Sequence, residues 1–234
     1  KHYIILTNFC VSVRAKVSMN DFSHKSLIIF DWDGTLMDSI GLIVDAMHHA
    51  ANANGVSVTS EATKGIIGIA LVEAIAMLFP DHPDKHDAIL ADYADYYVQH
   101  CDKDELFDGI YDLIHTLHRE GKTLAVATGK KRIGLERVFE GSGIKPFFIT
   151  SRCADETAGK PNPLMLEQIL AETGHQVEHA VMVGDSIHDI RMANNMGMHS
   201  VAVSYGCEVA GVLVQENPTA LADSVNELSC LLLS

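Results

Sequence analysis

Three short, uninterrupted apolar runs constrain the fold of this chain more than any other feature of its sequence. They are LIIF at 27–30, TLAVA at 123–127 and AVMV at 180–183. Runs of this length are typical of parallel strands that are buried on both faces of a sheet. The alternation predicts an α/β fold, in which helices cover both faces of a doubly wound parallel sheet. The expected helices lie at about 110–119, 131–140, 162–172 and 186–196.

Three weaker patterns extend the predicted core. FFIT at 147–150 and SVAV at 200–203 resemble further strands, and the leucine-rich segment 221–233 predicts a closing helix. A chain of 234 residues can bury roughly 70–75% of its unfolded surface, so it needs no disulfides to fold.

The segment 41–107 interrupts the alternation, because its apolar residues have helical spacing and it contains no good strand. We therefore predict a small all-helical cap domain inserted after the first strand. The core would then comprise 19–40 and 108–234, and residues 1–18 would form an N-terminal extension outside the fold.

Charge and cysteine content limit the class of partner. The chain has 17 basic and 31 acidic residues and a formal net charge of −14, which disfavours binding to nucleic-acid backbones. A small anionic substrate would then need a local cation at its site, for which a metal ion is the expected choice. No apolar run reaches the ~20 residues of a membrane span. The five cysteines form no CxxC pair, so we expect reduced thiols in a cytoplasmic protein.

An acidic pair follows the first predicted strand. Asp31 and Asp33 are two residues apart, and in extended backbone such residues point to the same side. Gly34 lets the chain turn away and allows a ligand to approach the backbone. Two neighbouring carboxylates repel each other unless a cation or a proton lies between them. The motif therefore predicts either a ligand pocket or a simple acidic turn.

Polar residues also follow the other two strong strands. Thr128 and Gly129 end the second, where a hydroxyl and free N–H groups suit a phosphate. Asp185 follows the third, with Asp189 four residues later. Lys160 precedes a predicted helix, so its positive charge opposes the helix dipole. An anion bound by both the lysine and the helix N-terminus would explain this placement. Each feature alone has an ordinary explanation as a turn, a cap or a surface lysine, but the three strand ends predict one site.

Together these pieces resemble the haloacid dehalogenase superfamily. The matching motifs are DWDGT at 31–35, ATG at 127–129, GKPNP at 159–163 and GDSIHD at 184–189, in the family order. Within that superfamily the chain is most similar to phosphatases with a helical cap inserted after the first strand, such as phosphoglycolate phosphatase. The resemblance implies a Rossmann-like core and hydrolysis of a small phosphorylated metabolite.

The resemblance also implies a phosphoaspartyl mechanism. Asp31 would be the nucleophile that attacks phosphorus, and Asp33 would protonate the leaving alcohol and then accept a proton from water. Thr128 and Lys160 would hold the phosphoryl oxygens, together with the backbone at Gly34 and Gly129.

A magnesium ion belongs to the same mechanism. By resemblance, Mg²⁺ would be held by the Asp31 side chain, the Asp33 carbonyl and Asp185. Asp189 would contact these ligands without binding the ion itself. Hard oxygen ligands of this kind are those that Mg²⁺ prefers. Without the ion, a dianionic ester could hardly approach Asp31.

The cap is expected to select the substrate. Segment 41–107 contains no arginine and only three lysines. Lys64, which precedes an apolar helical stretch, is the best candidate to grip a second anionic group on the substrate, although a solvent-facing lysine is the ordinary alternative.

Two other functions use similar residues. A sugar-phosphate mutase similar to β-phosphoglucomutase would share Asp31 and Asp33 but return the phosphoryl group to a bound sugar. A phospho-accepting signalling module similar to receiver domains also combines an acceptor Asp with Thr and Lys, but it needs no acid at the place of Asp33. The expected partner is a small phosphate ester, and the expected assembly is a monomer or weak homodimer.

Overall fold

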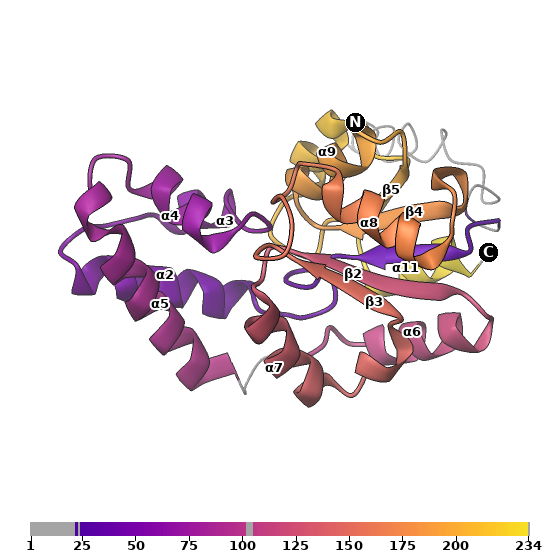
Figure 1. Ribbon diagram of the computed structural model, residues 1–234, viewed down its shortest axis with the longest axis horizontal. Coiled ribbons are helices and arrows are strands. Elements are labelled where there is room, and N and C mark those ends of the chain that lie inside the picture. The colour runs from indigo at the N-terminus through magenta and orange to yellow at the C-terminus, as the bar shows by residue number, and fades with distance from the viewer. Residues whose placement is uncertain (1–21, 23, 102–104, 234) are drawn as a thin grey trace, which may run out of the picture.

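The computed structural model describes residues 22, 24–101 and 105–233. Six parallel strands form one sheet in the order β3-β2-β1-β4-β5-β6, at the centre of the right-hand part of Figure 1. The predicted doubly wound α/β fold is therefore confirmed. The strands are β1 (Leu27–Phe30), β2 (Thr123–Thr128), β3 (Thr150–Cys153), β4 (Ala180–Gly184), β5 (His199–Val203) and β6 (Ala220–Ala222).

The central strand β1 sends alternate side chains to opposite faces. Ile28 and Phe30 pack in the apolar cluster that includes α6 (Ile110–Arg119), α7 (Arg132–Ser142) and α11 (Val225–Leu232). Leu27 and Ile29 pack in the cluster of α8 (Leu164–Thr173) and α9 (Ile187–Asn194). All four side chains are fully buried, which explains the uninterrupted apolar run in the sequence.

Four of the helices described between β1 and β2, those before α6, form a separate group on the left of Figure 1. They are α2 (Ile40–Ala53), α3 (Ser60–Lys64), α4 (Leu71–Leu78) and α5 (His86–His100). Helices α2 and α5 pack closely, and the group has apolar clusters of its own around Met47 and Ile67. We call α2–α5 and their loops the cap. The exact boundaries at 41–107 stay a prediction, and the predicted extension 1–18 lies outside the described residues.

Short elements complete the chain. Four 3-10 turns that lie wholly within the described residues and the single-turn helix α10 connect the larger elements. No helix within the described ranges has both the length and the apolar character that a bilayer span requires. The short elements are η1 (Pro83–Lys85), η3 (Lys145–Phe147), η4 (Val177–His179), α10 (Ala210–Leu213) and η5 (Val214–Glu216).

Two predicted elements are wrong in detail. The run 147–150 lies mostly before β3, because Phe147 and Phe148 pack against the core from a 3-10 turn and a loop. Strand β3 itself has the polar sequence TSRC. The segment 221–233 is divided between the end of β6 and α11, since Ser224 caps the helix by accepting a hydrogen bond from the backbone N–H of Glu227.

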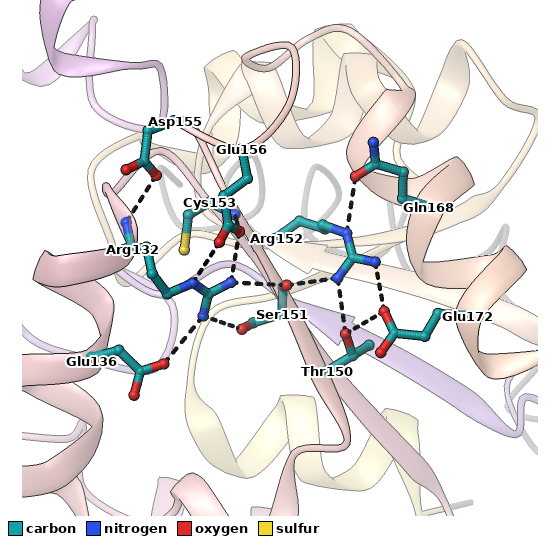
Figure 2. Close-up of polar contacts among 10 residues, drawn as sticks. All are labelled: Arg132, Glu136, Thr150, Ser151, Arg152, Cys153, Asp155, Glu156, Gln168 and Glu172. Carbon is teal, nitrogen blue, oxygen red and sulfur yellow. Dashed lines mark hydrogen bonds and ion pairs between the residues drawn. The ribbon is translucent and has the colours of Figure 1, made fainter.

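Strand β3 is polar because it is a sheet edge covered by charged groups (Figure 2). Arg132 of α7 donates to Ser151 Oγ at 2.7 Å and to Glu156 at 2.7 and 2.8 Å. Arg152, within the strand, reaches the other way and pairs with Glu172 of α8 at 2.5 Å. Charged side chains on an edge strand discourage pairing with a further strand.

Candidate active site

The carboxyl ends of three neighbouring strands meet at one edge of the sheet. Strand β1 lies between β2 and β4, so Asp31 lies between Thr128 at the end of β2 and Asp185 directly after β4. All three residues are buried. The topology thus brings together residues that are up to 154 positions apart (185 − 31), in the crevice where doubly wound sheets bind ligands.

Asp31 has one engaged and one open carboxylate oxygen. Its Oδ1 accepts from the backbone N–H of Trp32 at 2.7 Å and lies 2.8 Å from Lys160 Nζ. Its Oδ2 is buried without a hydrogen-bond partner among the described residues. A buried oxygen without a partner is costly, so this atom is suited to contact a ligand.

Lys160 links two acids from different elements. Its ammonium lies 2.8 Å from Asp31 Oδ1 and 2.7 Å from Asp189 Oδ1, and its side chain is fully buried. Burial acts to lower the pKa of this lysine, but Asp189 and Asp31 outweigh it and hold the pKa above its usual value. The two carboxylates therefore favour the positively charged form of Lys160 inside the site.

Three carboxylates gather around this single ammonium. Oxygen atoms of Asp31, Asp185 and Asp189 lie within 4.8 Å of one another. Burial raises the pKa of Asp31 well above its usual value despite Lys160. Burial, followed by the charge of Asp189, raises the pKa of Asp185 to about 6. Three acids against one ammonium leave an excess of two negative charges when all are ionised, which is the charge that a divalent cation would balance.

Asp185 and Asp189 are held in place by the chain around them. Asp185 accepts from Thr35 Oγ1 at 3.0 Å and from the backbone N–H of Cys207 at 2.7 Å. Asp189 closes a capping box with Ser186 at the start of α9, with Oδ2 at 2.6 Å from Ser186 Oγ. Ser186, rather than Asp185, is the cap of this helix.

Asp33 has different surroundings from Asp31. Its Oδ1 accepts from Ser39 Oγ at 2.5 Å and lies 2.9 Å from Lys130 Nζ. The same ammonium donates to Tyr97 Oη of the cap at 2.9 Å. The two acids of the DWDGT motif are thus both in the site, but each has its own lysine. Trp32 between them is fully buried in the core and packs against Phe139.

Glycines allow the backbone to close around Asp185. Gly34 has φ of 73°, and a Cβ there would lie 2.0 Å from Asp185 Oδ2. A Cβ on Gly206 would lie 2.3 Å from the same oxygen and from the carbonyl oxygen of Gly34. Only glycine fits at these two positions.

The loop after β2 touches the cap. A Cβ on Gly129 would lie 2.7 Å from the carbonyl oxygens of Gly68 and Ile69. The hydroxyl of Thr128 accepts from the backbone N–H of Lys130 at 3.2 Å. The predicted phosphate loop thus lies directly under a cap loop.

A cavity of about 310 Å³ lies between the cap and the core, with Asp31 and Asp33 in its wall. The cap contributes mainly apolar and tyrosine side chains to the lining. Lys64, the predicted anion-binding residue, is exposed at the end of α3 and is not among the residues of this cavity.

Four contact residues were not predicted from the sequence. Lys130 directly follows Thr128-Gly129, so a positive charge at that strand end was the available signal. Ser39, Tyr97 and Cys207 reach the site through the fold of the cap and of the loop after β5, and no local motif marks them.

The family comparison agrees with this geometry. Residues 28–203 match the model of the haloacid dehalogenase-like hydrolases. The chain belongs to this family. The matched range contains every motif that carried the resemblance, from DWDGT to GDSIHD.

The curated proteins to which this chain is similar carry several names. The chain is 29% identical over 213 residues to a phosphoglycolate phosphatase of Vibrio parahaemolyticus, with 86% of this chain and 93% of that protein covered. It is 29% identical over 205 residues to the pyrophosphatase PpaX of Halalkalibacterium halodurans, with 86% and 94% covered. It is 34% identical over 208 residues to the tyrosine-protein kinase PtkA of Mycobacterium tuberculosis, with 86% and 70% covered.

Solved structures share the fold of this haloacid dehalogenase-like chain. A putative phosphoglycolate phosphatase from Lactobacillus delbrueckii superposes with a TM-score of 0.78 at 25% identity, covering 88% of this chain and 98% of that one. A predicted phosphatase from Clostridium acetobutylicum gives a TM-score of 0.80 at 22% identity, covering 89% and 98%.

Proposed function

We propose that this protein is a phosphatase that hydrolyses a small phosphate monoester through a phosphoaspartyl intermediate at Asp31. The observation that carries the proposal is the buried Oδ2 of Asp31, which has no protein partner in the described chain although Lys160 and two further acids surround it. Family membership and the names of the curated relatives support the same class of reaction.

The first step transfers the phosphoryl group to the enzyme. A carboxylate oxygen of Asp31 attacks phosphorus, and the bond between phosphorus and the ester oxygen breaks. The electron pair of that bond stays on the leaving oxygen, which takes a proton from Asp33. Lys160, 2.8 Å from Asp31, offsets the negative charge that builds up as the dianion approaches.

The second step restores the enzyme. A water oxygen attacks the phosphorus of the acyl phosphate while Asp33 accepts a proton from that water. The bond between phosphorus and the Asp31 oxygen breaks, which releases inorganic phosphate and regenerates the carboxylate. Ser39 and Lys130 hold Asp33 Oδ1 for both proton transfers.

The side chains present fit a magnesium ion. Hard carboxylate oxygens, an orphaned Oδ2 on Asp31 and an excess of negative charge are the features that such an ion requires. Asp31 and Asp185 would hold it, together with the Asp33 carbonyl, and Asp189 would orient Lys160. When bound, such an ion would supply positive charge to offset the negative charge of the phosphoryl oxygens.

The mutase alternative is less well supported. A solved structure titled putative β-phosphoglucomutase, from Bacteroides vulgatus, has a TM-score of 0.78 at 21% identity, which concerns the fold alone. A hexose phosphate presents several hydroxyl groups, but the cap lines the cavity mainly with apolar side chains. Buried hydroxyls without partners are unfavourable, so the lining favours a simpler alcohol. The match to the hydrolase family does not support the alternative of a receiver-like signalling module.

A phosphate-release assay tests the proposed function. Purified protein is incubated with a panel of small phosphate esters, with Mg²⁺ and with chelator, and the phosphate is measured. We expect sustained turnover that depends on Mg²⁺ and is lost in Asp31→Asn. Asp45→Asn, on the exposed side of α2, is the matched control and should keep full activity. Equal activity in Asp31→Asn and wild type would refute the assignment.

A further inference from the structure

We propose that the alcohol part of the substrate is an apolar group, aromatic or branched aliphatic, without a second anionic group. This inference rests on the proposed phosphatase function and concerns the same cavity. It differs from what the names of the relatives suggest, since phosphoglycolate carries a carboxylate two atoms from its phosphate group.

The cap side of the cavity is apolar. Its lining comes from α2, α4, α5 and the loop before α4, and it leads directly to Asp31 and Asp33. Filling such a surface with a hydrocarbon group removes apolar area from water, which favours binding. The apolar cap residues of the lining are Ile43, Met47, Ile66, Ile67, Ile69, Leu71, Ala74, Ala94 and Val98.

Within the described chain, the cap offers no cation to this cavity. Lys64 is exposed and does not line it. Lys85 is used elsewhere, because its Nζ donates to the carbonyl oxygen of Asn54 at 2.9 Å. A carboxylate next to the apolar cap residues would lose its hydration without gaining a partner there.

The basic residues of the cavity come from the core. Lys130 is already shared between Asp33 and Tyr97. Lys131 is exposed and Arg137 is half-buried, so both of these charges keep contact with solvent. They can attract a phosphate ester toward the site, while the cap surface selects its organic part.

Two stacked tyrosines form one wall of the cavity. The rings of Tyr93 and Tyr97 lie 6.0 Å apart with 14° between their planes. The hydrogen bond from Lys130 fixes Tyr97 against the core. A rigid aromatic wall of this kind suits a flat ring or a compact branched group.

The size of the cavity limits the substrate further. Its volume of about 310 Å³ is at the lower end of the range of roughly 300–1,000 Å³ that is usual for ligand sites. One small organic group and a phosphate fit, so a phosphorylated macromolecule would have to present a single side chain.

Binding of non-hydrolysable analogues tests the inference independently of turnover. Benzylphosphonate and phosphonoacetate are titrated into the wild-type protein with Mg²⁺, and the two Kd values are compared by calorimetry. We expect benzylphosphonate to bind about tenfold more tightly or better, as one well-placed apolar group can give. Equal or tighter binding of phosphonoacetate would overturn the inference. Selective binding without any phosphate release would instead overturn the proposed function.

Two matched substitutions locate the selectivity in the cap. Val98 lines the cavity from α5 and is 43% exposed, whereas Val72 of α4 is 54% exposed and lies outside the lining. Val98→Lys should reduce the preference for benzylphosphonate about tenfold by adding a cation. Val72→Lys should change it less than about twofold, and thermal unfolding verifies that both variants fold. Equal effects of the two variants would place the selectivity outside this cavity.

Discussion

Asp31 and Asp33 differ in their surroundings although only Trp32 separates them. Asp31 lies in a cluster of acids around Lys160, and Asp33 lies between Ser39 and Lys130. The spacing in the sequence predicts that both enter the same pocket. It cannot predict their partners, because these come from strand ends and loops that are distant in the chain. In the mechanism that we propose, this difference in partners suits Asp31 to nucleophilic attack and Asp33 to proton transfer.

Removing the buried ammonium of Lys160 should lower the free energy of unfolding. Lys160→Met leaves Asp31 and Asp189 buried without their cation, and breaking a buried pair costs about 3–5 kcal/mol. We expect the free energy of unfolding in urea to fall by that amount in the presence of chelator, and Mg²⁺ to restore part of it. Lys64→Met, at an exposed lysine, is the control and should stay within about 0.5 kcal/mol of wild type. A stable Lys160→Met protein would show that the pair is dispensable.

In the proposed mechanism, Lys130 positions the carboxylate of Asp33, which lies 2.9 Å from its ammonium. Lys130→Gln removes the ammonium that holds Asp33 Oδ1 and Tyr97 Oη. We expect kcat to fall about 100-fold, in line with the contribution of general acid–base catalysis, while KM changes little. Tyr97→Phe removes only the hydrogen bond on the cap side and should have a smaller effect. If Lys130→Gln raised KM and left kcat unchanged, Lys130 would bind substrate instead.

At the scale of the elements, the end of β2 and the cap loop before α4 are in close backbone contact. Gly129→Ala would place a methyl group 2.7 Å from the carbonyl oxygens of Gly68 and Ile69, so the cap loop must move away from the core. We expect a clear loss of phosphatase activity with retained folding, measured by phosphate release and circular dichroism.

Gly41→Ala is the matched control for Gly129→Ala. Gly41 lies in α2, and a Cβ there meets nothing within 4 Å. Alanine should therefore raise the free energy of unfolding by up to about 1 kcal/mol, as usual within a helix, and leave activity unchanged. Full activity in Gly129→Ala would show that this contact of core and cap is not needed.

The charged network on β3 predicts a loss of stability in acid (Figure 2). Arg132 lowers the pKa of Glu156 below its usual 4.5, and Arg152 does the same for Glu172. Because the folded-state pKa values are lowered, the pairs stabilise the fold above pH 4.5, and this contribution is lost as the pH falls through the lower values. The side chains are partly exposed, so each pair contributes less than about 1 kcal/mol.

Urea unfolding between pH 3 and pH 7 measures this effect. Arg132→Ala should lower stability at pH 7 and have a smaller effect near pH 3, because its carboxylate partners become protonated as the pH falls through their lowered pKa values. An effect of Arg132→Ala that is the same at both pH values would contradict an electrostatic role for the network.

At the scale of the whole molecule, the sequence predicts the core better than the cap. Buried central strands leave a plain apolar signal, as LIIF in β1 shows. The sequence did not predict strand β3 correctly, because its edge position makes it polar. It did not predict β6, because that strand has only three residues. The shape and lining of the cavity depend on how α2–α5 pack on the core, and local patterns do not encode that packing. Lys64 illustrates this limit: its place in the chain suggested a ligand contact, but it lies on the exposed end of α3.

The proposed mechanism requires a covalent phosphoryl group on Asp31. During turnover of a phosphate ester with Mg²⁺, the protein is quenched in acid and reduced with borohydride, which converts an aspartyl phosphate to homoserine. Mass spectrometry of the peptide around residue 31 should show that conversion in wild type and not in Asp31→Asn. Steady turnover with an unmodified Asp31, or with the modification on another acid, would contradict the central claim.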